Sequence, residues 1–136
     1  MIGANGVHHV GIAVADLDAA IEHYTSTVGG RLEFRRELPD QGIEGAVVMV
    51  GDDEIELIAP LGDNSTVARF LERRGPGLHH VAYAVDDVEA SLRQLEAAGT
   101  RLIDQHPRIG LHGVPIAFVH PSAAFGVLVE LVEASH

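Results

Sequence analysis

The sequence predicts an α+β fold made of two tandem β-α-β-β-β modules. The first observation is an internal repeat: residues 9–20 and residues 80–91 lie 71 positions apart and are identical at six of twelve positions. A repeat of this kind indicates an architecture built by duplication. The second observation is that each copy is followed by the same order of patterns, which is typical of a strand, a helix and three further strands.

The first module begins with an alternating strand over residues 7–14. Asp16 is suited to cap a helix whose apolar residues recur at helical spacing, and Gly29-Gly30 is suited to end it. Turn-forming residues then separate three expected strands, at residues 31–37, 43–50 and 54–59.

A short linking helix is expected at residues 65–74, where Gly75-Pro76 provides the stop. The second module then restarts with the repeated strand, and Asp87 takes the capping position that Asp16 has in the first module. Its remaining strands are expected at residues 100–104, 114–120 and 127–132, with a long Gly- and Pro-containing segment after the first of them.

The length and the apolar content, 136 residues and 46%, suit one compact domain with a buried core. We expect a single domain over residues 1–136, with module 1 at about 6–62, the linker helix at 65–74 and module 2 at about 77–133. If the chain formed two independent domains, each would be too small to bury a stable core of its own.

The composition excludes several kinds of chemistry. Cysteine is absent and all nine cationic residues are arginine, which removes disulfides, thiolate ligands and lysine Schiff bases. A net charge of −11 with few aromatic residues gives no electrostatic footprint for nucleic acid. No run approaches the roughly 18 apolar residues of a membrane span, and no export signal is visible, so we expect a cytoplasmic protein without a membrane partner.

The repeated strand places one imidazole on an otherwise small-residue face in each module. Side chains alternate between the faces of a strand, so the face with His9 or His80 carries otherwise only glycine and alanine. His8 and His79 point to the other face and are expected to be structural. Each copy therefore offers one imidazole nitrogen to an open space.

A glutamate lies inside an apolar strand in each module, Glu56 in the first and Glu130 in the second. A carboxylate buried without a partner costs several kcal/mol or becomes neutral, and the chain has no lysine to pair with it. A single strand histidine is more often a packed core residue than a ligand. The recurrence of both residue types at equivalent positions nevertheless favours a metal site made of His9, Glu56, His80 and Glu130.

Two imidazoles and two carboxylates suit a divalent ion such as Co²⁺, Mn²⁺, Ni²⁺, Zn²⁺ or Fe²⁺. Such a site can hold two oxygens of one substrate and withdraw electrons from a carbonyl, which acidifies the neighbouring carbon. This set of ligands is compatible with each of these ions.

The chain resembles the vicinal oxygen chelate superfamily and, within it, the methylmalonyl-CoA epimerases. The resemblance covers nearly the whole chain and rests on residues 9–14, 41–43, 56–62, 77–83, 107–113, 118–121 and 126–131. The segments at 107–113 (Pro-Arg-x-Gly-x-x-Gly) and 118–121 (Phe-x-His-Pro) are the most particular to the epimerases. The resemblance implies a glyoxalase-like fold whose sheets close around a metal cup, in a homodimer.

The activity implied by the resemblance is that of an isomerase acting on an acyl-CoA. It would interconvert (R)- and (S)-methylmalonyl-CoA by proton transfer at C2 through a metal-stabilised enolate. The metal ligands carry over as His9, Glu56, His80 and Glu130. The cofactor would be one divalent metal ion, with Co²⁺ favoured and Mn²⁺, Ni²⁺ or Zn²⁺ as alternatives.

The catalytic carboxylates expected on this basis are Glu130 as the base and Glu56 as the second group. Some family members carry an acid/base glutamate where this chain has Gly45. The neighbouring Glu44 is a substitute candidate, although a regular strand would turn its side chain to the opposite face. Candidates for positioning the substrate are Gln41, Arg108 and His112.

Three alternative functions remain open. A glyoxalase I type lyase acting on hemithioacetals would use the same pattern of two histidines and two glutamates. An extradiol-type dioxygenase would need only one carboxylate, so Glu56 argues against it. A metal-free module that binds a small molecule such as an antibiotic would have no reason to keep Glu130 in an apolar strand.

Overall fold

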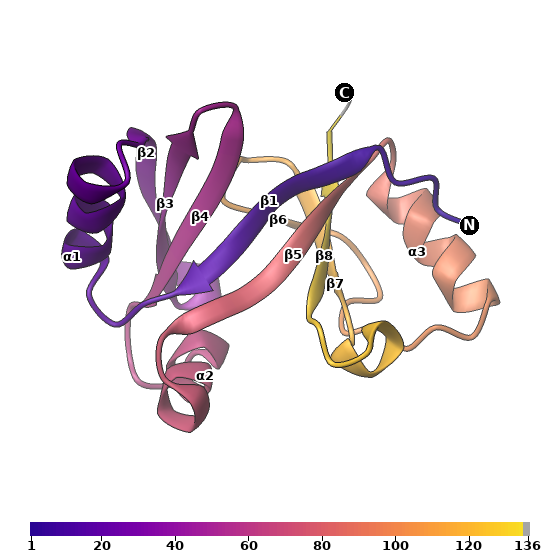
Figure 1. Ribbon diagram of the computed structural model, residues 1–136. Coiled ribbons are helices and arrows are strands. Elements are labelled where there is room, and N and C mark those ends of the chain that lie inside the picture. Colours follow the sequence, from indigo (N-terminus) through magenta and orange to yellow (C-terminus); the bar gives the residue numbers. More distant parts are fainter. Residues whose placement is uncertain (135–136) are drawn as a thin grey trace. The chain divides into compact units, whose positions relative to one another are not determined.

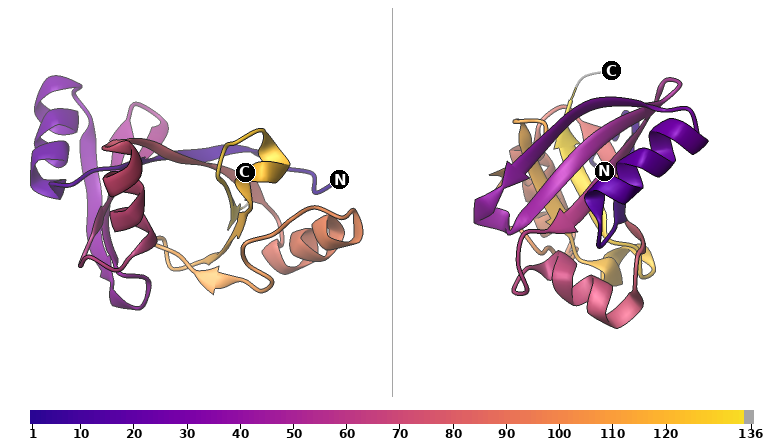
Figure 2. Two further views of the ribbon diagram at one scale, coloured as in Figure 1. Left: turned by 90° about the horizontal axis from the view of Figure 1, so that it is seen from below. Right: turned by 90° about the vertical axis from the view of Figure 1, so that its left-hand side faces the viewer.

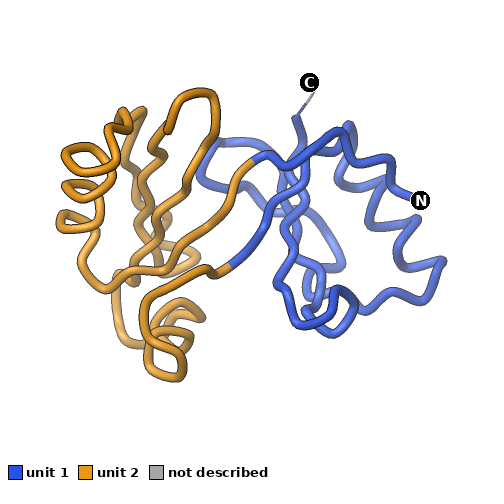
Figure 3. The backbone as a smooth tube through the Cα atoms, viewed as in Figure 1, with its two compact units in different colours: residues 1–8, 80–136 blue, residues 9–79 orange. Residues whose placement is uncertain are grey.

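The computed structural model describes residues 1–134, which form two compact units (Figure 3). One unit is residues 9–79, and the other contains residues 1–8 and the chain from residue 80 onward. The last two residues of the expected domain, Ser135 and His136, lie outside the described residues. None of the helices described is long and apolar enough to cross a membrane.

The first module has the expected β-α-β-β-β order (Figure 1). Its strand order is β2-β3-β4-β1, in which β1 pairs with β4 in parallel and the other pairs are antiparallel. Its elements are β1 (Gly6–Ala13), α1 (Leu17–Glu22) followed by a π-helical turn (His23–Thr27), β2 (Arg31–Leu38), β3 (Ile43–Val50) and β4 (Asp53–Pro60).

The second module repeats this order after the linking helix α2 (Thr66–Arg74). Its strand order is β5-β8-β7-β6, and β5 pairs with β8 in parallel, as β1 does with β4. Its elements are β5 (Gly77–Val85), α3 (Val88–Ala97), β6 (Arg108–Ile109), β7 (Pro115–Val119) and β8 (Val129–Glu133). The α+β class and the duplicated order are therefore confirmed.

The helices begin at the capping residues that the sequence indicates. Asp16 and Asp87 each accept a hydrogen bond from the backbone amide three residues further on, at 3.0 and 2.9 Å. Ser65 does the same for α2 at 3.0 Å. Each bond satisfies one of the amides that have no partner within the first helical turn.

The expected strand at residues 100–104 is wrong. Leu102 forms only an isolated bridge with Val119. The Asp104 carboxylate instead accepts a hydrogen bond from the Phe118 backbone amide at 2.8 Å. The Phe118 amide is thus bonded to a side chain and not to the backbone carbonyl of a neighbouring strand. The short strand β6 forms further along the chain, inside the segment expected to be a loop.

Each sheet has an outer face covered by a helix. In residues 9–79, α1 packs on the outer face of its sheet and α2 packs on the opposite face (Figure 2). The outer core is Leu17, Ala46, Val48, Leu57 and Ala59, and the core beneath α2 is Ala13, Ile58 and Val67. In the other unit α3 packs on β7 and β8 through Val88, Leu92, Ala117, Val119, Val129 and Leu131. The faces that carry His9 and His80 are opposite the α1 and α3 cores.

Replacing Gly30 with alanine is expected to destabilise the protein. A Cβ at Gly30 would lie 2.7 Å from Val48 Cγ1 and 2.9 Å from the Tyr24 carbonyl oxygen. Overpacking of this kind typically costs about 1–3 kcal/mol of unfolding free energy, measurable by urea denaturation. Gly62→Ala is the matched control because no atom lies within 4 Å of its added Cβ. Equal stability of the two variants would contradict this packing.

Candidate metal centre

Burial along β1 and β5 follows the expected alternation. His9 and His80 are 1% and 2% exposed, and the glycine and alanine residues on their faces are buried as well. The parallel strand pairs place Gly11 next to Glu56 and Ala82 next to Glu130. Partners in register share a face of the sheet, so each glutamate lies on the face of its module's buried imidazole.

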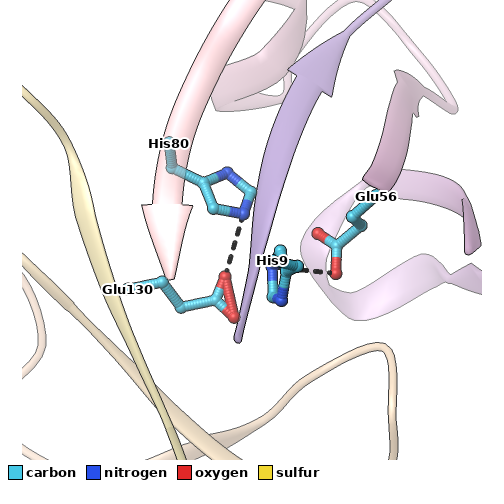
Figure 4. Close-up of side chains that lie close together, drawn as sticks. All are labelled: His9, Glu56, His80 and Glu130. Atoms are coloured by element: carbon cyan, nitrogen blue, oxygen red, sulfur yellow. Dashed lines mark ion pairs between the residues drawn. The ribbon is translucent and has the colours of Figure 1, made fainter. Parts of the chain in front are cut away.

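The first half-site consists of His9 and Glu56, within residues 9–79. His9 Nε2 lies 3.3 Å from Glu56 Oε2, and the carboxylate residue is 5% exposed (Figure 4). The imidazole therefore presents Nε2 to a buried carboxylate. Two donor atoms of the kinds that divalent metals bind are held side by side.

The second half-site consists of His80 and Glu130. His80 Nε2 lies 3.1 Å from Glu130 Oε2, with Glu130 4% exposed (Figure 4). Phe118 is in register with Glu130, and its ring lies edge-to-face with His80 at 5.8 Å. The second half-site thus repeats the first in residue type, ring nitrogen and strand placement.

The donor chemistry of these residues fits a divalent metal. His9, Glu56, His80 and Glu130 are all buried and can serve as metal ligands. Imidazole nitrogens and carboxylate oxygens suit the first-row divalent ions. Buried carboxylates also need positive charge nearby, which such an ion supplies.

Glu44 lies on the opposite face of the sheet from His9 and Glu56. It is in register with Ala59, which belongs to the outer core beneath α1. Its carboxylate lies 3.4 Å from the Arg35 guanidinium, which also pairs with Asp18 of α1. The hydrogen bond to Asp18 raises the pKa of Arg35 above its ordinary value. Glu44 is thus one of two carboxylates that pair with Arg35 on the outer face.

Gly45 provides no side chain on the inner face of its sheet, the face that carries His9 and Glu56. It is buried and in register with Ile58, two residues from Glu56 on the same face. Its neighbour on β2 is Arg36, whose guanidinium lies 4.9 Å from the centre of the Phe34 ring. No carboxylate therefore stands where the resemblance places an acid/base group.

The substrate-positioning candidates have different surroundings. Arg108 makes an ion pair with Asp104 at 2.9 Å and lies 5.2 Å from the centre of the Phe118 ring. His112 is half-buried, with its ring 5.0 Å from that of His8. Gln41 ends a short 3-10 helix just before β3. Arg108 is linked to the second half-site by way of Phe118, whose ring lies 5.8 Å from that of His80.

Sequence reasoning missed two carboxylates. Asp104 holds Arg108, and its only signal is the spacing of four residues between them. Glu54 lies 3.5 Å from His9 Nδ1, and its signal is a position two residues before Glu56, on the same strand face. The expected structural packing of His79 is consistent with its ring lying 4.9 Å from that of Phe70.

Known proteins with related sequences identify the family. The sequence profile of the Glyoxalase/Bleomycin resistance protein/Dioxygenase superfamily matches residues 8–118. The ethylmalonyl-CoA/methylmalonyl-CoA epimerase of Cereibacter sphaeroides is 41% identical over 133 residues, which cover 96% of this chain and 98% of that protein. The chain belongs to the methylmalonyl-CoA epimerase family.

Solved structures agree with this membership. Methylmalonyl-CoA epimerase from Mycobacterium tuberculosis is 44% identical with a TM-score of 0.91, covering 98% of this chain and 90% of that one. A variant of the Streptomyces coelicolor epimerase in complex with 2-nitronate-propionyl-CoA is 33% identical with a TM-score of 0.92, covering 96% and 94%. The glyoxalase-like fold of these epimerases is therefore confirmed for this chain, which is an isomerase of the same family.

Metal should stabilise the protein, because an ion bound only by the folded state shifts the unfolding equilibrium. At a free concentration 100 times the dissociation constant the gain is about 2.7 kcal/mol. Calorimetry of chelator-treated protein, with and without added Co²⁺, should show a higher Tm with metal. His9→Ala and His80→Ala should each reduce this gain, whereas His106→Ala, which changes an exposed histidine, should keep it. A full gain in both of the first two variants would contradict the assignment.

Proposed function

We propose that this protein is a methylmalonyl-CoA epimerase, which interconverts the (R) and (S) forms of its substrate by exchanging the proton at C2. The observation that carries the proposal is the buried histidine–glutamate pair supplied by equivalent strands of both modules. The names of its relatives support the substrate class, an acyl-CoA.

The two half-sites would together hold one divalent metal ion. Co²⁺ is the first candidate, and Mn²⁺, Ni²⁺ and Zn²⁺ are the alternatives. When bound, the ion would supply Lewis acidity toward the thioester and carboxylate oxygens and so lower the cost of the negative charge that develops at C2 deprotonation. His9 and His80 would contribute Nε2, the ring nitrogen that faces the glutamate in each pair.

The carboxylates would carry the proton. Glu130, as the carboxylate, would accept the proton from C2 on one face, and Glu56, in its protonated form, would deliver its own proton on the other face, which inverts the configuration. Both are buried, and each lies on the strand face that carries the imidazole of its own module. With Gly45 lacking a side chain and Glu44 paired with Arg35 on the outer face, Glu56 is the carboxylate of its half-site that suits the second role.

Arg108 would bind an anionic group of the substrate, with Gln41 and His112 as further positioning residues. Asp104 engages the Nε and Nη2 groups of Arg108, which fixes the guanidinium beside the Phe118 ring. The substrate would then meet Nη1, whose donors point away from that pair in the planar fork. A fixed guanidinium loses less entropy on binding than a mobile one.

A cytoplasmic homodimer is also proposed. Val7 and Leu78 occupy equivalent positions of the repeat and are 57% and 60% exposed. Apolar side chains repeated at exposed strand positions are suited to burial against a second copy. A highly charged CoA thioester does not cross membranes unaided, so an enzyme acting on it is expected inside the cell.

Glu130→Gln should slow deuterium uptake from D₂O into C2 of methylmalonyl-CoA by about 10²–10⁴-fold, because the amide cannot accept the proton. Proton NMR of the substrate measures this rate, and metal analysis of the same sample separates lost chemistry from lost metal. Glu37→Gln, which changes an exposed carboxylate on β2, is the charge control. Near-normal exchange by metal-loaded Glu130→Gln would remove this residue from the mechanism.

Arg108→Gln should raise KM for methylmalonyl-CoA by about 10–100-fold with a smaller change in kcat, because a charge-assisted hydrogen bond contributes roughly 1.5–3 kcal/mol. Steady-state kinetics measures both constants. Arg101→Gln removes the same charge from an exposed residue and should leave KM near the parent value. Equal effects of the two substitutions would indicate general charge attraction instead of a specific contact.

A further inference from the structure

Glu54 is a partly buried carboxylate that has no role in the proposed metal centre or in the proposed proton transfer. Its Oε2 atom lies 3.5 Å from Nδ1 of His9, and its side chain is 15% exposed. The same imidazole has its other nitrogen, Nε2, 3.3 Å from Glu56. His9 therefore lies between two carboxylates, one facing each ring nitrogen.

This arrangement suits an outer carboxylate that orients a metal-binding histidine. An imidazole that gives Nε2 to a metal must carry its proton on Nδ1, and an acceptor at Nδ1 fixes both the tautomer and the ring orientation. Glu54 and Glu56 lie two residues apart on β4, so their side chains share one face and reach the two nitrogens of one ring.

We infer that Glu54 is a positioning residue that holds the His9 ring for metal binding. The inference rests on the proposed metal centre and goes beyond it, because Glu54 is not itself a ligand in that proposal. The second module differs at the matching place. Leu128 precedes Glu130 by two residues, and the His80 ring packs against Phe118. The His9 ring thus has a carboxylate beside Nδ1, whereas the His80 ring packs against an aromatic side chain.

The test measures the affinity for Co²⁺ by competition with a chelator. Outer-shell partners of ligating histidines typically contribute 10–100-fold to metal affinity, so Glu54→Ala should weaken binding by about that factor. Glu54→Gln should lose less, because its amide oxygen still accepts a hydrogen bond from Nδ1. Asp53→Asn is the matched control, since it removes the same charge from the adjacent exposed residue.

Two further measurements separate orientation from folding. In Zn²⁺-loaded protein the His9 Nδ1 proton should give a slowly exchanging signal in ¹H–¹⁵N spectra, and Glu54→Ala should broaden or remove it. The Tm of the metal-free protein should be similar in Glu54→Ala and the parent. Glu54→Ala binding Co²⁺ within twofold of the parent would overturn the inference, as would a loss of affinity matched by a loss of metal-free stability.

His9→Ala distinguishes this inference from the proposed function. If His9→Ala binds Co²⁺ as tightly as the parent, the metal centre itself is wrong and the role of Glu54 fails with it. If His9→Ala loses the metal but Glu54→Ala does not, only the role of Glu54 is wrong. Weakened binding in both variants, with the Nδ1 signal lost in Glu54→Ala, supports both.

Discussion

A buried imidazole facing a buried carboxylate is the interaction on which each half of the structure depends. Removing both groups from water costs several kcal/mol per charge, and only close geometry offsets that cost. The parallel pairing of β1 with β4 and of β5 with β8 provides this geometry. The residues in register with the glutamates are Gly11 and Ala82, whose small size leaves room for the polar groups. Larger side chains there would crowd the imidazole–carboxylate pairs.

The helices determine where this polar face ends. In residues 9–79, α1 covers the outer face, and α2 covers the end of the inner face where Ala13 and Ile58 lie. What remains of the inner face of β4 is the stretch that carries Glu54 and Glu56. Apolar packing beneath α1 and α2 thus confines the ionisable groups on this face of β4 to one short segment beside His9.

Properties that depend on local periodicity could be predicted from the sequence, and those that depend on contacts between distant segments could not. The capping residues, the strand faces and the pairing of His9 with Glu56 follow from a period of two, a helical stripe and a duplication. The strand expected at 100–104 failed because the Asp104 side chain binds an amide of β7, a contact that no local pattern reveals. Glu54 did have a local signal, two residues before Glu56 on the same strand face, but its contact with His9 depends on the register of β1 against β4.

The duplication explains why the two half-sites share their ligand types, and their surroundings show how far the halves have diverged. His9 has a second carboxylate at Nδ1, which strengthens it as a donor and limits its rotation. His80 instead packs against Phe118, on which the Arg108 guanidinium also lies. The Phe118 ring thus contacts both an imidazole and a guanidinium, which brings a positive charge into the neighbourhood of the second half-site. From one duplicated pattern, the first module has thus gained a second carboxylate beside its imidazole, and the second an aromatic ring with a guanidinium on it.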